Sequence, residues 1–249
     1  SDMHCGHAHG LTPPEFQNDS PYYAQLKREQ SEPWDFYSGV VKNLGSVDAL
    51  FVMGDCIDGK GKRSGSTELI TSDELQQVEI AKRCIEEVSF KKAYFVYGTP
   101  YHASGDGNDF EYLIAEHFSG SIGDHLWVDV NGITFDLKHK IGASTIPHGR
   151  LTALAKECLW NTQWHKIDGQ PQADIFLRGH VHYHTYCGDE TYLAMTLPAL
   201  QSPITKYGGR QCSGTVNFGL VAFDVPEHAT LSDVVWKKYN PKLKIMGIL

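Results

Sequence analysis

Short apolar segments that stop at a glycine beside an acidic or histidine side chain most constrain the fold of this sequence. Three of them lie far apart in the chain: 50–53 (LFVM) before Gly54-Asp55, 93–97 (AYFVY) before Gly98 and His102, and 174–177 (DIFL) before Gly179-His180. Runs of this length and apolar content are typical of buried strands. Because layered α/β folds build their sites where strands end, the polar side chains predict one shared site.

Helical and turn signals fall between these strands. Apolar residues recur at helical spacing over 72–88, 108–118 and 149–164, which predicts three helices. Segments 126–130 and 133–137 alternate around Asn131-Gly132 and predict a β-hairpin, and later strands are expected over 191–197 and 216–225. Four prolines make us expect mostly loop over 11–33. No repeat or linker divides the chain, so we expect a single α/β domain over residues 1–249.

Composition and charge exclude several classes of protein. Of the 249 residues, 41% are hydrophobic and 21% are charged, as in ordinary globular proteins, so a disordered or coiled-coil chain is excluded. The 22 basic against 30 acidic residues give a net charge of −8, which does not favour nucleic acid as a partner. No apolar stretch approaches the roughly 18–20 residues that cross a bilayer, and no leader opens the chain, so we expect no membrane partner.

The six cysteines include no CxxC pair, which argues against a zinc knuckle or a redox dithiol. The simplest interpretation is free thiols in a reducing, cytoplasmic location, although the even count also allows disulfides.

Histidine is abundant and clustered, with 13 residues in the chain. Asp2 and His4 form a D-x-H pair, which in an extended segment places both side chains on one side. The candidate ligands at the chain start and the strand ends are Asp2, His4, Asp55, His102, His139, His180 and His182. Mixed carboxylate and imidazole donors suit Mn, Fe, Zn or Ni. An Asp between two His groups can bridge two ions roughly 3.5–4 Å apart, which hold a hydroxide and clamp a phosphoryl group.

The motifs that carry these residues are Asp2-Met3-His4, Gly54-Asp55-Cys56-Ile57-Asp58, a glycine turn before His102, an isolated His139, and Gly179-His180-Val181-His182. In this order they resemble the motifs of the calcineurin-like metallophosphoesterases. The resemblance implies a four-layer αββα sandwich of two mixed β-sheets flanked by helices, with a dinuclear metal centre at the strand ends. It implies Asp2, His4 and His182 as ligands of the first ion, His139 and His180 as ligands of the second, and Asp55 as the bridge.

The third motif departs from the family pattern. It reads Gly98-Thr99-Pro100-Tyr101-His102 and lacks the Asn that in the family ligates the second ion. Thr99 aligns with that Asn but is a poor ligand. His102 either replaces the ligand or keeps the family role of stabilising the transition state and protonating the leaving oxygen, and we favour the second interpretation.

Two further departures bear on function. Asp58-Gly59-Lys60 stands where the protein Ser/Thr phosphatases have Asp-Arg-Gly, so we do not expect a phosphoprotein phosphatase of the calcineurin type. The family also has a strand before its D-x-H, whereas only Ser1 precedes Asp2 here. Either upstream residues are absent from the sequence, or the first ion is weakly held. A looser resemblance, through 10–14, 54–65 and 98–102, is to uncharacterised phosphoesterases of phages and their bacterial hosts.

Other polar and aromatic residues have plainer interpretations. We interpret His7, His9 and His184 as rim residues, Asp58 as a partner of a ligand, the lysines at 237, 238, 242 and 244 as solvated, Trp160 and Trp164 as helix packing, and Lys60, Lys62 and Arg63 as a solvated loop. Arg150 is the better candidate for binding the substrate, because a helix start there would add backbone N–H groups to its guanidinium.

These observations favour an enzyme, a hydrolase that uses two divalent metal ions, with manganese favoured over iron, zinc or nickel. A metal-bound hydroxide would attack a phosphomonoester or a phosphodiester while His102 assists the leaving group. The alternatives are a DNA or RNA nuclease of the same superfamily and a non-catalytic protein that binds metal. The oligomeric state stays open.

Overall fold

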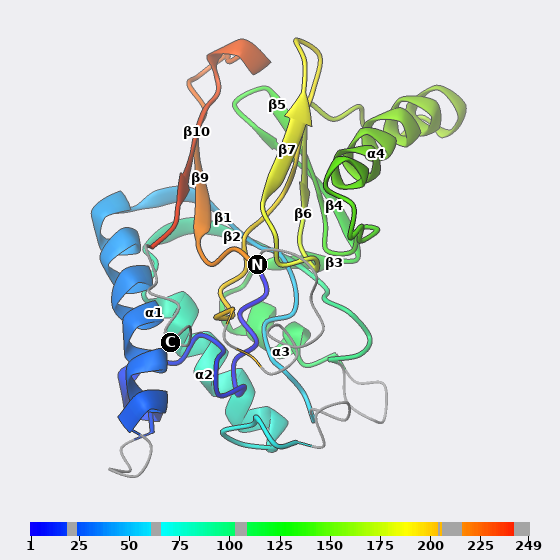
Figure 1. Ribbon diagram of the computed structural model, residues 1–249. Helices are drawn as coiled ribbons and strands as arrows, with labels where there is room; N and C mark the ends of the chain where they lie inside the picture. Colours follow the sequence, from blue (N-terminus) through cyan, green and yellow to red (C-terminus); the bar gives the residue numbers. More distant parts are fainter. Residues whose placement is uncertain (19–23, 61–65, 103–108, 204, 206–215, 242–249) are drawn as a thin grey trace.

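The computed structural model describes residues 1–18, 24–60, 66–102, 109–203, 205 and 216–241, whose strands form three sheets (Figure 1). The first sheet has three parallel strands, β1 (Val47–Val52), β2 (Phe90–Val96) and β3 (Ser121–Gly123), in the order β1-β2-β3. A separate antiparallel pair joins β9 (Leu220–Asp224) and β10 (Val235–Tyr239).

The second sheet has five strands in the order β4-β5-β6-β8-β7. They are β4 (His125–Val130), β5 (Ile133–Lys138), β6 (Ile175–Arg178), β7 (Thr185–Gly188) and β8 (Leu193–Thr196). Strands β5, β6 and β8 are parallel, whereas β4 and β7 pair antiparallel at the edges. The predicted hairpin is confirmed as β4 and β5, and its turn residues Asn131 and Gly132 both have positive φ, as a type I′ turn requires.

Four α-helices accompany the sheets: α1 (Ala24–Leu44), α2 (Glu74–Glu86), α3 (Glu111–His117) and α4 (Pro147–Asp168), with short 3₁₀ turns η1 (Pro14–Phe16) and η3 (Leu231–Asp233). Helix α2 begins where the Asp73 carboxylate accepts the backbone N–H groups of Leu75 and Gln76. Helix α4 has a proline in its first turn and ends at Gly169 in the left-handed conformation.

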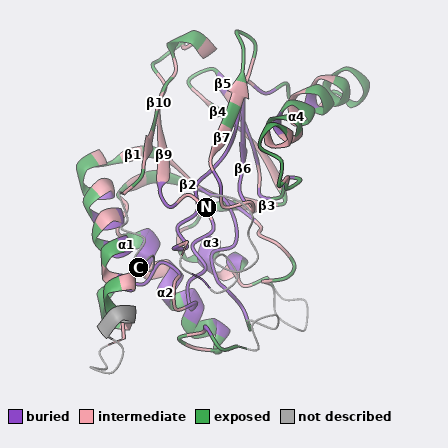
Figure 2. Cartoon of the chain, in the orientation of Figure 1, coloured by how far each residue is buried: buried purple, intermediate pink, exposed green. Residues whose placement is uncertain are grey.

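The alternation of side chains along each strand produces four layers. In β2, Phe95 packs into the core under α1, α2 and α3, whereas Tyr94 faces the second sheet. In β6, Leu177 faces the first sheet and Phe176 packs under α4. The layers therefore follow the order helices, first sheet, second sheet, α4, and the expected αββα arrangement is confirmed. Helix α4 is largely exposed on its outer side (Figure 2).

Two expectations about elements were wrong. Residues 11–33 are not mostly loop, because α1 begins at Ala24 and contains Pro33. The helix tolerates this proline because Trp34, Tyr37 and Val41 bury their side chains in the first core. The lysine-rich tail also contains structure, since residues 237 and 238 lie in β10, while residues 242 and 244 fall outside the described part.

Among the described residues, no helix combines the length and the apolar character that crossing a bilayer would need.

Candidate metal centre

The ends of β1, β2, β5 and β6 bring the predicted ligands together. The N-terminal segment runs parallel to the chain that follows β1, with the Asp2 N–H donating to the Gly54 carbonyl at 3.0 Å and the His4 N–H to the Asp55 carbonyl at 3.0 Å. Across the second sheet, the Gly179 N–H donates to the His139 carbonyl at 2.9 Å. The loops of both sheets therefore meet at one edge, where parallel strands end.

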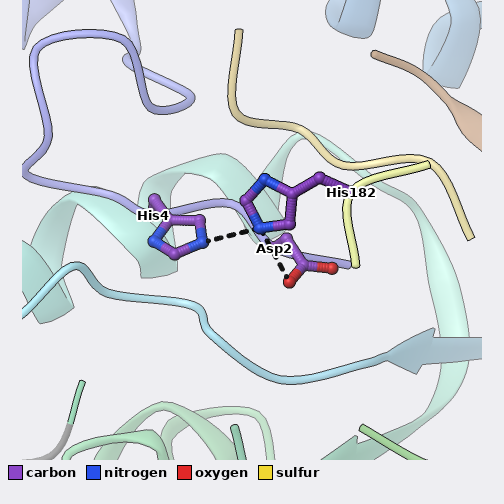
Figure 3. Close-up of side chains that lie close together, drawn as sticks. All are labelled: Asp2, His4 and His182. Atoms are coloured by element: carbon purple, nitrogen blue, oxygen red, sulfur yellow. Dashed lines mark hydrogen bonds and ion pairs between the residues drawn. The ribbon is translucent and has the colours of Figure 1, made fainter. Parts of the chain in front are cut away.

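Asp2, His4 and His182 form the first group of metal-ligating side chains (Figure 3). The Nε2 atom of His182 lies 3.2 Å from Asp2 Oδ1 and 3.2 Å from His4 Nε2. Asp2 is fully buried, and its carboxylate accepts the His180 backbone N–H at 3.1 Å. The three side chains point toward one another and leave their donor atoms facing a common point.

Asp55, His139 and His180 form the second group. His139 Nε2 lies 3.0 Å from Asp55 Oδ2 and 3.9 Å from Asp2 Oδ1, so it stands between the two carboxylates. The His139 and His180 rings are edge-on, with centroids 5.5 Å apart. Asp55 thus lies in the second group while His139 links it to the first.

His102 belongs to a third group, with His4 and Asp55. Its Nε2 lies 3.8 Å from Asp55 Oδ2, and its ring is edge-on to His4 with centroids 4.6 Å apart. His102 therefore stands on the side of His4, away from the group of His139 and His180. This position does not coincide with a replacement of the missing Asn ligand of the second ion.

Three of the imidazoles are oriented in the same way. His139 donates its Nδ1–H to the Met53 carbonyl at 2.6 Å, His102 donates its Nδ1–H to the Asp58 carbonyl at 2.8 Å, and His4 Nδ1 lies 3.0 Å from Asp58 Oδ1. Because each Nδ1 carries the proton in these contacts, each Nε2 faces the interior of the site. Oriented imidazoles with an oxygen acceptor behind them are typical of metal ligands.

The backbone is strained at the same residues. Positive φ angles occur at Asp2, His4, Asp55, His180 and His182, of 53°, 47°, 49°, 70° and 53°. Side-chain-bearing residues rarely adopt this conformation, which costs on the order of 1–3 kcal/mol each. Its recurrence at five candidate ligands indicates that the fold sacrifices backbone energy to aim these side chains.

The electrostatics of the site couple carboxylates to imidazoles. Burial opposes ionisation of Asp2 and Asp55, but the neighbouring histidines outweigh it and hold the pKa of each carboxyl well below its usual value. For His139, burial acts against the charged form, yet contacts with Asp55 and Asp2 raise its pKa to about 9. Burial lowers the pKa of His4 and of His180. The site thus holds ionised carboxylates in a buried, histidine-rich setting.

Thr99 occupies the position of the missing Asn. Its backbone N–H donates to Asp55 Oδ1 at 2.6 Å, and its hydroxyl lies 3.2 Å from the same oxygen. Thr99 therefore holds the carboxylate of Asp55. It does not join any of the groups of candidate ligands among the described residues.

Arg150 lies near the start of α4. Its guanidinium stacks on the ring of Tyr183, 4.0 Å from the centroid, and Tyr183 follows His182 in the chain. Its Nε–H donates to the Ser144 carbonyl at 3.4 Å. Within the described part of the chain no carboxylate forms an ion pair with Arg150, so its charge is not neutralised there.

The other histidines lie outside these groups. His7 is buried rather than on the rim; burial lowers its pKa to about 4, and its Nε2 lies 4.0 Å from Glu68. His9 lies 3.5 Å from Glu29 and 4.0 Å from Glu68. His184 donates its Nδ1–H to the Thr196 carbonyl at 2.8 Å.

The basic residues of the predicted loop do not form a groove that the structure describes. Lys60 pairs with Glu74 at 3.4 Å, and residues 62 and 63 lie outside the described part of the chain. Trp160 and Trp164 are neighbours on α4, as expected, but both are about half exposed, at 52% and 43%, rather than packed against the sheet.

Sequence reasoning missed Glu111, which is buried directly behind the site. Its two carboxylate oxygens accept the backbone N–H groups of Cys56 and Gly98. In the sequence it is one acidic residue in the first turn of a predicted helix, where a glutamate is ordinarily solvated. Only the meeting of the two loops in space gives it partners.

Neither the known family models nor the curated proteins match this chain. Solved structures that are similar include a variant of Vps29 from Entamoeba histolytica, 12% identical with a TM-score of 0.40, over 84% of this chain and 89% of that one. A novel archaeal phosphodiesterase is 10% identical with a TM-score of 0.40, over 78% of this chain and 99% of that one. A predicted phosphoesterase from Streptococcus pneumoniae is 12% identical with a TM-score of 0.34, over 70% and 80%. Similarities this weak carry no inference about function, so the proposals below use this chain's own residues.

Proposed function

We propose that this protein is a metal-dependent phosphoesterase that hydrolyses phosphomonoesters or phosphodiesters with two divalent ions. The observation that carries the proposal is the convergence of two buried, ionised carboxylates with imidazoles whose Nε2 atoms face inward. A structural metal site would be closed by its ligands, whereas this one has His102 beside it as a further polar group.

The residues fit two ions of borderline softness. Asp2, His4 and His182 would hold the first ion, His139 and His180 the second, and Asp55 would bridge them. Oxygen and imidazole donors without thiolate suit manganese, iron, zinc or nickel, and we favour manganese. Such ions supply a nucleophile from water at neutral pH and neutralise charge on the phosphoryl oxygens. The second ion would have fewer protein ligands than the first, because Thr99 donates to Asp55 instead of ligating.

His102 is suited to deliver a proton to the leaving oxygen. Its Nδ1–H is fixed on the Asp58 carbonyl, so Nε2 is the atom that can hold or release a proton toward a substrate. The side chain is 15% exposed, which leaves it accessible from the site. We therefore keep His102 as a catalytic residue rather than a ligand of the second ion.

Arg150 is the residue that we propose binds the substrate phosphate. Its guanidinium is held by the Tyr183 ring next to His182, at the start of a helix whose first backbone N–H groups attract anions. A planar guanidinium without a carboxylate partner can bind two phosphoryl oxygens at once.

We also propose a reducing, cytoplasmic location. Cys5, Cys56, Cys84, Cys158 and Cys187 are free thiols, and no disulfide joins any of the described cysteines. The closer resemblance to phage and bacterial phosphoesterases stays a prediction.

The test is hydrolysis of para-nitrophenyl phosphate and bis-para-nitrophenyl phosphate by metal-stripped protein that has been reloaded with Mn²⁺. We expect activity that is lost in His182→Ala and His102→Ala, with Mn²⁺ binding reduced only in the first. Arg150→Ala is expected to raise KM for the monoester about tenfold, the loss of one charge-assisted contact. His117→Ala, an exposed histidine of α3, is the matched control and should keep full activity.

The outcomes separate the alternatives. Binding of two equivalents of Mn²⁺ without hydrolysis of either ester, or of single-stranded DNA or RNA, would replace the enzyme with a metal-bearing binding protein. Hydrolysis of the nucleic acids alone would favour the nuclease, which the ion pair of Lys60 with Glu74 does not support.

A further inference from the structure

We propose that Glu111 is a positioning residue of the metal centre, which clamps the loop of Asp55 against the loop of Thr99. The inference rests on the proposed function, because the role concerns ions that Asp55 would bridge. Glu111 does not reach the donor groups itself and would act through Asp55.

The clamp consists of one carboxylate between two backbone N–H groups. Glu111 is the first residue of α3 and is 6% exposed. One of its oxygens accepts the Cys56 N–H at 2.8 Å, and the other accepts the Gly98 N–H at 2.5 Å. Cys56 follows β1 and Gly98 follows β2, so a single side chain from a helix joins the ends of two strands of the first sheet.

Both contacts lead to the carboxylate of Asp55. Cys56 is the next residue in the chain, so its anchored N–H fixes the backbone of Asp55. Gly98 precedes Thr99, whose N–H donates to Asp55 Oδ1 at 2.6 Å. Glu111 therefore sets the position of the Asp55 backbone and also that of the donor which holds the Asp55 side chain.

The packing of the two loops shows how tightly they are held. A Cβ atom on Gly98 would lie 2.1 Å from Asp55 Oδ1, so only glycine allows this approach. Asp55 itself has a φ of 49°, a conformation that persists only when surrounding contacts enforce it. A clamp at this point supplies such contacts.

The burial of a carboxylate here has no other structural use among the described residues. No cation pairs with Glu111, and burial together with the charge of Asp55 raises its pKa to about 7. A cavity of about 10 Å³, the size of about one water molecule, separates Glu111 from Thr99 and His102. An acidic group kept behind the site at this electrostatic cost is expected where it serves the site.

The test compares Glu111→Gln with the wild type by calorimetric titration of Mn²⁺ into metal-stripped protein. Glutamine has the same size but turns an amide NH₂ toward one of the two N–H donors, so one half of the clamp is lost. We expect Mn²⁺ affinity 10–100-fold weaker, and kcat lowered by a similar factor with KM for the ester unchanged.

Asp136→Asn is the matched control. Asp136 is another buried carboxylate, 1% exposed, which pairs with Arg178 and His125 within the second sheet. Its substitution should lower thermal stability and leave the Mn²⁺ affinity of the wild type. If Asp136→Asn weakens Mn²⁺ binding as much as Glu111→Gln, the effect is general destabilisation and the positioning role is overturned.

The remaining outcomes also decide. Wild-type affinity in folded Glu111→Gln overturns the positioning role and leaves the proposed function intact, whereas a wild type that binds no divalent ion overturns both. If Glu111→Gln does not fold, Glu111→Asp replaces it, because a carboxylate one methylene shorter cannot reach both N–H groups and should show the same loss. Failure of both variants to fold would make Glu111 a folding determinant and overturn the proposal.

Discussion

At the scale of single residues, the orientation of a histidine separates the candidate ligands from the other histidines. His4, His102 and His139 each turn Nε2 toward Asp2 or Asp55, because Nδ1 is held by an oxygen behind it. His184 has the same kind of Nδ1 contact, but its ring packs against Trp236 and meets no carboxylate. Residue type alone does not make the distinction, and the acceptor behind the ring matters only where Nε2 has a site to face.

Asp58 is the residue on which two of these orientations depend. We expect Asp58→Ala to weaken Mn²⁺ binding about 10–100-fold, because His4 loses the acceptor of its Nδ1–H. Asp58→Asn keeps an acceptor oxygen and should lose less. Calorimetric titration of metal-stripped protein measures both. Asp73→Ala, which removes the cap of α2, should cost about 1 kcal/mol of stability without changing Mn²⁺ affinity. Equal Mn²⁺ affinity in Asp58→Ala and the wild type would contradict the prediction.

Glu111 predicts a pH dependence of stability in the metal-free protein. Burial raises its pKa from 4.5 to about 7, so the folded state binds the proton more tightly than the unfolded state. The resulting stabilisation is complete below pH 4.5 and is lost as pH rises to about 7. We expect the free energy of unfolding of the wild type, measured in urea, to fall over this interval relative to that of Glu111→Gln. A constant difference between the two proteins across the interval would refute the assignment.

At the scale of elements, local patterns predicted the strands and most helices, and tertiary contacts decided the rest. The apolar runs before Gly54 and Gly179 became β1 and β6, and the Asn131-Gly132 turn became a hairpin, because these signals lie within a few residues. Helix α1 was missed, because Pro33 marks a break and only packing on the first core outweighs it. Glu111 was missed for the related reason that its two partners lie 55 and 13 residues away in the chain.

Two glycines of α1 give opposite predictions for the same substitution. Gly39 lies inside the helix, and a Cβ there would meet nothing within 4 Å, so Gly39→Ala should stabilise the protein by about 1 kcal/mol. Gly45 has equal space but a φ of 69°, just after the helix, so Gly45→Ala should destabilise it by about 1 kcal/mol. Urea unfolding measures both. Changes of the same sign in the two variants would show that backbone conformation does not control them.

At the scale of the whole molecule, the candidate ligands connect the two large sheets. Asp55 follows the first sheet, and Asp2 and His4 lie in the segment beside it, whereas His139, His180 and His182 follow strands of the second sheet. Ions held by both sets would join the two halves of the four-layer fold. The stability of the whole protein should therefore depend on the metal, and not only that of the loops around it.

Buried thiols provide a measure of this coupling. Cys5, Cys56 and Cys84 are almost fully buried in the first core, and burial raises the pKa of the Cys5 and Cys56 thiols well above the usual value. They can react with an alkylating reagent only when the core opens. At a free Mn²⁺ concentration 100 times its Kd, binding contributes about 2.7 kcal/mol. We therefore expect alkylation of these three cysteines, followed by peptide mass spectrometry, to slow about 100-fold.

The partly exposed Cys158 and Cys187 are the internal reference, because their reaction does not require the first core to open. His182→Ala is the matched variant: with a ligand of the first ion removed, the same Mn²⁺ concentration should give much weaker protection. If Mn²⁺ binds the wild type and the three buried thiols still react at the metal-free rate, then the ions do not couple the sheets. The centre would in that case be a local feature of its loops, since any ligand that binds only the folded state must slow global opening.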